Sequence, residues 1–152
     1  MSEVFFYHLT WQPLEQTLPK LIALAKKAGW RIAIRGTEVD RLAMLDAKLW
    51  EGDGFLAHGM AGGPHDADQP VLLTTGPAAN APDCLISVDG AALAPEEIKP
   101  LKRAMVLFDG NDDAALSVAR GQWSMLTGAA VPAKYWSQES GSWEMKAEHP
   151  KA

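Results

Sequence analysis

The residues whose types could carry metal chemistry gather in one glycine-rich stretch, residues 58–69. It contains His58, His65, Asp66 and Asp68. Imidazole and carboxylate groups placed together can supply three ligands to a divalent metal and leave a position for water. Their spacing matches no established motif, and a flexible loop positions ligands poorly. Solvated loop residues are therefore the favoured interpretation, and a small metal-dependent hydrolase using His58, His65 and Asp68 is kept as the alternative function.

Other catalytic and cofactor-binding patterns are missing from the sequence. The expected first strand-to-helix connection, residues 9–13, contains no glycine that would let the backbone approach a pyrophosphate. Neither a phosphate-binding Gly-Lys-Ser/Thr loop nor a Gly-x-Ser-x-Gly elbow occurs. Cys84 lies in an apolar run typical of a buried structural thiol, and His8 at the end of another is interpreted as a structural histidine. We expect no catalytic activity, metal or cofactor.

The length and net charge of the chain further limit the class of protein to which it can belong. The chain has 152 residues, of which 47% are hydrophobic, enough for one core and too few for two ordinary domains. The net charge of −5 repels phosphate, so we expect contact with DNA only through a partner. Residues 1–9 lack both a basic segment and a long apolar segment, which predicts no signal peptide and no membrane span. The expected localisation is cytoplasmic.

Short apolar runs alternate with helical periodicity along the chain. This pattern predicts an α/β fold with three layers, in which helices cover both faces of a mostly parallel, mixed sheet. We expect a single domain over residues 1–132 and a C-terminal tail over 133–152 that forms either a hairpin packed on the domain or a loosely packed end. The expected strands are 4–9, 30–35, 71–75, 84–88 and 103–108. The expected helices are 14–28, 37–50, 95–99 and one that is capped by Asn111 or Asp112 and runs to about Thr127. In the second of these helices, the predicted apolar stripe consists of Val39, Leu42, Leu45 and Leu49.

Two places have the composition of a contact surface. Trp50 ends a helix just before a glycine turn and Phe55, where large rings can remain partly exposed. Aromatic anchors at the centre of an interface commonly contribute a few kcal/mol each. Packing of Trp50 and Phe55 over the sheet edge explains the pattern equally well, so both interpretations stay open.

The second place is the last long helix. Leu116, Trp123 and their helical neighbours form an apolar stripe with Arg120 at its border. A guanidinium beside an apolar notch can bind a carboxylate, although an ordinary surface arginine has the same spacing. Gly121 in the helix interior predicts that another group approaches its backbone closely, and a neighbouring strand is one explanation.

The order of several short motifs resembles the chi subunit family of bacterial DNA polymerase III holoenzyme. The motifs are Phe5-Phe6-Tyr7, residues 45–50, residues 55–58, Leu85-Ile86-Ser87 and Ala119-Arg120 followed by Trp123. This resemblance spans roughly residues 4–126. It implies a nucleotide-binding-like fold without a nucleotide site and a non-catalytic accessory subunit of the replicative polymerase, which bridges the clamp loader to single-stranded DNA-binding protein.

The resemblance also implies two partner sites. Trp50 and Phe55 match the family's aromatic contacts to the psi subunit of the clamp-loader complex, and Leu56 lies next to them in the sequence. The acidic, phenylalanine-ended C-terminal tail of single-stranded DNA-binding protein is expected at a second site. The residues implied there are Arg120, Trp123, Phe108, Leu116 and Ser124.

The second site departs from the family pattern in its charge. Trp123 stands where a tyrosine is usual, Ser124 replaces a lysine and Leu116 replaces another basic residue. We therefore expect a weaker or differently arranged grip on the tail. The basic residues that could restore the missing positive field are Lys99, Lys102, Arg103 and Lys134.

Overall fold

The computed structural model describes residues 3–10, 13–50, 59–62, 66–138 and 143–150. In these ranges an eight-stranded sheet has the order β3-β4-β2-β5-β6-β1-β7-β8. Adjacent strands are parallel, except that β8 runs antiparallel to β7. The strands are β1 (Glu3–Leu9), β2 (Ile32–Arg35), β3 (Gly59–Met60), β4 (Val71–Thr74), β5 (Cys84–Ser87), β6 (Arg103–Asp109), β7 (Ala133–Ser137) and β8 (Glu144–His149).

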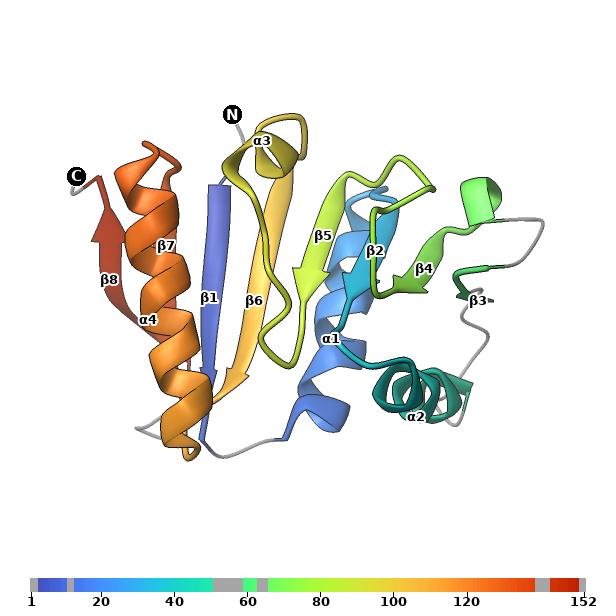
Figure 1. The fold of residues 1–152 in the computed structure, drawn as a ribbon, viewed down its shortest axis with the longest axis horizontal. Coiled ribbons are helices and arrows are strands. Elements are labelled where there is room, and N and C mark those ends of the chain that lie inside the picture. The colour runs from blue at the N-terminus through green and yellow to red at the C-terminus, as the bar shows by residue number, and fades with distance from the viewer. Residues whose placement is uncertain (1–2, 11–12, 51–58, 63–65, 139–142, 151–152) are drawn as a thin grey trace.

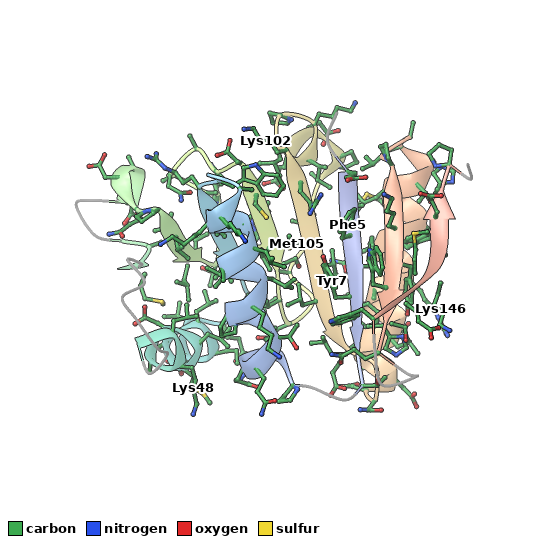
Figure 2. The ribbon with its side chains drawn as sticks, turned by 180° about the vertical axis from the view of Figure 1, so that it is seen from behind. Phe5, Tyr7, Lys48, Lys102, Met105 and Lys146 are labelled. Atoms are coloured by element: carbon green, nitrogen blue, oxygen red, sulfur yellow. The ribbon has the colours of Figure 1, made fainter. Side chains whose placement is uncertain are left out.

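Helices cover both faces of this sheet, as the sequence pattern predicts. Figure 1 shows α4 and α3 in front of the strands and α1 behind them, and Figure 2 shows α1 from its own side. The predicted α/β fold with a mostly parallel sheet is confirmed. The helices are α1 (Leu14–Lys27), α2 (Val39–Trp50), α3 (Pro95–Ile98) and α4 (Asp113–Gly128), with a short 3-10 turn η1 (Asp66–Asp68).

Alternation along β1 divides its side chains between two apolar clusters. Successive side chains of a strand point to opposite faces. Phe5 and Tyr7 pack in the cluster under α1 and α2 (Figure 2), whereas Val4 and Phe6 pack in the cluster under α4. Because both faces are buried, the strand is a continuous apolar run. Neighbouring residues of one strand therefore serve different sides of the molecule.

One residue of the apolar stripe predicted for α2 does not face the sheet. Leu42, Leu45 and Leu49 are buried as expected, but Val39 is 59% exposed. At 100° per residue, Val39 lies about a quarter turn from the centre of that stripe. The first residue of the helix therefore faces solvent rather than the sheet.

Helix α4 begins and ends where the sequence places it. The side chain of Asp112 accepts hydrogen bonds from the backbone N–H groups of Ala114 and Ala115, which caps the helix as predicted. A neighbouring strand does not approach Gly121, because a Cβ built there would meet nothing within 4 Å. Gly121 is exposed, on the side of α4 that faces away from the sheet.

Candidate partner-binding sites

One side of α4 presents the residues implied in tail binding. Arg120 and Ser124 are exposed, while Leu116 and Trp123 are partly buried against the cluster under the helix. Residues three and four positions apart share a helix side, so these four are neighbours. Phe108, on β6 beneath the helix, is only 6% exposed. Phe108 therefore belongs to the floor of this region rather than to its accessible surface.

An aromatic cluster surrounds Trp123. The centroid of its ring lies 5.4 Å from that of Phe6 and 6.1 Å from that of Tyr135 on β7, and both pairs pack edge to face. Phe108 lies 6.0 Å from the same Tyr135 ring. The implied residues Trp123 and Phe108 are thus joined through Tyr135, for which the sequence predicts no role. No local sequence pattern could predict the contacts of Tyr135, because they depend on the pairing of β7 with β1.

His8 anchors this cluster from below. It is 7% exposed, and its ring stacks on Phe108 with a centroid distance of 5.2 Å. A hydrogen bond of 2.8 Å joins its Nδ1 to the Oη of Tyr135. The interpretation of His8 as a structural histidine agrees with this packing.

Two of the four basic residues that could add positive charge near Arg120, Arg103 and Lys134, lie on the other face of the sheet. Within the described part of the chain, Arg120 forms no ion pair. The guanidinium of Arg103 lies 4.1 Å from the Phe5 ring, and Lys134 Nζ lies 5.5 Å from that ring. Phe5 belongs to the opposite face of the sheet, so neither residue supplies the positive field that the sequence left open.

A cavity of about 770 Å³ lies between the ends of β1 and β6 and the starts of α1 and α4. This edge is where related α/β folds bind nucleotides. Its arginine, Arg41, is already paired: Nη1 lies 2.7 Å from Glu15 Oε1, and Nε lies 3.1 Å from Asp89 Oδ2. Although partial burial opposes the effect, the backbone and Arg41 hold the pKa of Glu15 below its usual value. The cavity therefore presents a neutralised arginine and further carboxylates, which do not suit a phosphate.

The implied psi site lies at the end of α2. Trp50 is the last residue of this helix. Its side chain lies outside the described residues, as do Phe55 and Leu56, so the structure does not show how they pack. Nearer the start of the helix, Val39 and Met44 are 59% and 61% exposed, and Ala43 and Ala47 are exposed beside them. The sequence already contains this row, since Val39, Ala43 and Ala47 are spaced four residues apart.

The alternative metal loop is only partly described. His58 and His65 lie outside the described residues, and Asp68 is exposed in η1. The carboxylate of Asp66 accepts a hydrogen bond of 2.9 Å from the backbone of Gly62, which is an ordinary loop contact. Among the residues that the structure describes, no three His, Cys, Asp or Glu side chains could hold a metal ion together. In the same ranges no helix has the length and apolarity needed to cross a membrane.

The chain forms an α/β domain with a sheet topology like that of nucleotide-binding folds, and it carries an exposed arginine beside an aromatic cluster. The family model described as DNA polymerase III chi subunit, HolC, matches residues 1–134. The chain therefore belongs to the chi subunit family of DNA polymerase III, whose members are non-catalytic accessory subunits in DNA replication. The resemblance noted in the sequence is confirmed. No curated protein matches the sequence significantly.

Proposed function

We propose that this chain bridges the clamp-loader assembly, through psi, to the acidic C-terminal tail of single-stranded DNA-binding protein. The observation that carries the proposal is the exposed Arg120 beside the partly buried Trp123 and Leu116 on α4. A guanidinium binds a carboxylate through charge-assisted hydrogen bonds, and the adjacent apolar surface suits an aromatic side chain. Membership of the chi family supports this assignment. The proposed setting is the cytoplasm, and DNA is reached only through the partner.

The second half of the bridge is proposed at α2. Val39, Ala43 and Ala47 form an exposed apolar row on the side of the helix that leads to Trp50. Exposed apolar rows of this kind commonly mark protein interfaces. We place the psi contact on this row and on Trp50, Phe55 and Leu56. Two modest contacts joined in one rigid domain strengthen each other, because the second binding event becomes intramolecular.

The test of tail binding is calorimetric titration of the full chain with a short acidic peptide that ends in phenylalanine. Arg120→Ala should weaken binding by about 10- to 100-fold, because a hydrogen bond to a charged group contributes about 1.5–3 kcal/mol. Higher salt should also weaken binding to the original protein, and the salt effect should be smaller in the variant.

A matched control is Lys27→Ala, which removes an exposed positive charge at the end of α1, on the other side of the sheet from α4 (Figure 1). This variant should bind the peptide as the original protein does. If the original protein shows no heat of binding at high concentration, or if Arg120→Ala and Lys27→Ala lose affinity equally, the proposed tail site is wrong.

A further inference from the structure

We propose that Tyr135, held in place by His8, forms the sheet-side wall of the tail site and contacts the terminal aromatic ring of the bound peptide. This inference rests on the proposed function and extends its site from α4 onto β7. The family model ends at residue 134, so Tyr135 is the first residue beyond the matched region. No residue of the implied tail site comes from this strand.

The geometry places Tyr135 next to the proposed ligand. Its ring lies 6.1 Å from Trp123, with an interplanar angle of 78°. Both rings are only partly buried, and both pack against the cluster beneath α4. Trp123 in turn shares its helix side with Arg120. The two rings therefore make an aromatic corner beside an exposed guanidinium, and this combination suits a peptide end that carries both a carboxylate and an aromatic ring.

The hydroxyl group of Tyr135 points to the interior of the protein. Its Oη forms a 2.8 Å hydrogen bond with Nδ1 of His8, which is 7% exposed. Stacking on Phe108 holds the His8 ring in turn. Because one end of the tyrosine is fixed in this way, little ring freedom is lost when a ligand packs against it, and preorganised surfaces bind more tightly for that reason.

The charge of the site supports an acidic occupant rather than a basic one. Among described residues, Arg120 forms no ion pair, so its positive charge is available to a ligand. Leu116 and Ser124, which share its side of the helix, carry no charge. With fewer charges, more of the affinity must come from aromatic packing, which Trp123 and Tyr135 can supply.

The test is a set of titrations of the full chain with two peptides, an acidic peptide ending in phenylalanine and the same peptide ending in alanine. Tyr135→Ala should weaken binding of the phenylalanine-ended peptide by about 10-fold, which is typical of an aromatic contact. Tyr135→Ala should change the affinity for the alanine-ended peptide by no more than about 2-fold, because that peptide has no terminal ring that could contact Tyr135. Tyr135→Phe keeps the ring and should stay within about 3-fold of the original protein.

Met145→Ala is the matched control. Met145 is 46% exposed on β8 and pairs with Trp136, and the Trp136 ring packs on Phe5, on the face of the sheet opposite α4. Tyr135→Leu replaces Tyr135→Ala if thermal melting shows that the alanine variant is unfolded. If Tyr135→Ala or Tyr135→Leu weakens both peptides equally, or neither, while Arg120→Ala still weakens binding, the inference about Tyr135 is overturned and the proposed function stands. Absence of binding to the original protein would overturn both.

Discussion

Arg35 holds both carboxylate oxygens of Glu97. Its Nη2 lies 2.6 Å from Oε2, and its Nη1 lies 3.0 Å from Oε1. The guanidinium also donates to the backbone oxygens of Gly76 and Ala92, and its side chain is 9% exposed. This pair joins the end of β2 to α3 and to two loops. A charge buried in this way requires its partners, because an unpaired buried charge is costly.

Replacing Glu97 by glutamine should destabilise the fold. Glu97→Gln removes the negative charge but keeps the size of the side chain, and we expect a loss of about 1–3 kcal/mol in unfolding free energy. Urea unfolding followed by circular dichroism measures the change. Glu96→Gln, on the same helix but exposed, is the control and should have almost no effect. Equal stability of the two variants would contradict the prediction.

The same pair predicts a dependence of stability on pH. The hydrogen bond from Arg35 holds the pKa of Glu97 below its usual value. The stabilisation is therefore fully present above the pKa of an unfolded glutamate and is lost as pH falls through the lower, folded pKa. The difference in melting temperature between the original protein and Glu97→Gln should shrink as the solution is acidified below about pH 4. A difference that stays constant down to acid unfolding would contradict this assignment.

Gly110 should tolerate no side chain. A Cβ at this position would lie 1.7 Å from Cδ2 of His8. The His8 ring cannot move away freely, since it stacks on Phe108 and is hydrogen-bonded to Tyr135. Gly110→Ala should therefore cost about 1–3 kcal/mol of stability. Gly76→Ala is the control, because a Cβ there meets nothing within 4 Å.

Gly121 offers the opposite outcome. It lies within α4 and is exposed, and nothing within 4 Å would contact an added Cβ. Alanine loses less backbone entropy in a helix, so Gly121→Ala should stabilise the protein by about 0.5–1 kcal/mol. Thermal or urea unfolding measures this change. Destabilisation would mean that a neighbouring group does approach the helix at this point.

Trp50→Ala should disrupt the complex with psi while leaving tail-peptide binding intact. Aromatic anchors commonly contribute about 2 kcal/mol or more, which corresponds to about 30-fold in affinity. Co-purification of the two proteins followed by calorimetry measures the loss. Leu24→Ala, which alters an exposed apolar residue of α1, is the control. Unchanged complex formation would remove the assignment of this helix end.

Local periodicity was enough to predict the four helices and strands β1, β2, β4, β5 and β6, but not β3, η1 or the pairing of β7 with β1. The spacing of Leu42, Leu45 and Leu49 predicted the buried side of α2, and the type of Asp112 predicted the cap of α4. These features depend on residues only a few positions apart, which is why a single sequence contains them. Gly121 shows the limit of this reasoning. Its position inside a helix could not reveal whether another element packs nearby.

The tail site also combines features that nearby residues predict with contacts that depend on distant parts of the chain. The sequence itself determined the α/β class, the chi-type motifs and the placing of Arg120 and Trp123 on one side of a helix. Only the tertiary structure brought Tyr135 to Trp123 and His8, and it moved Arg103 and Lys134 to the opposite face. The physical reason is that strand order is set by how the whole sheet packs: β7 pairs with β1 across more than a hundred intervening residues, and no local pattern encodes that choice.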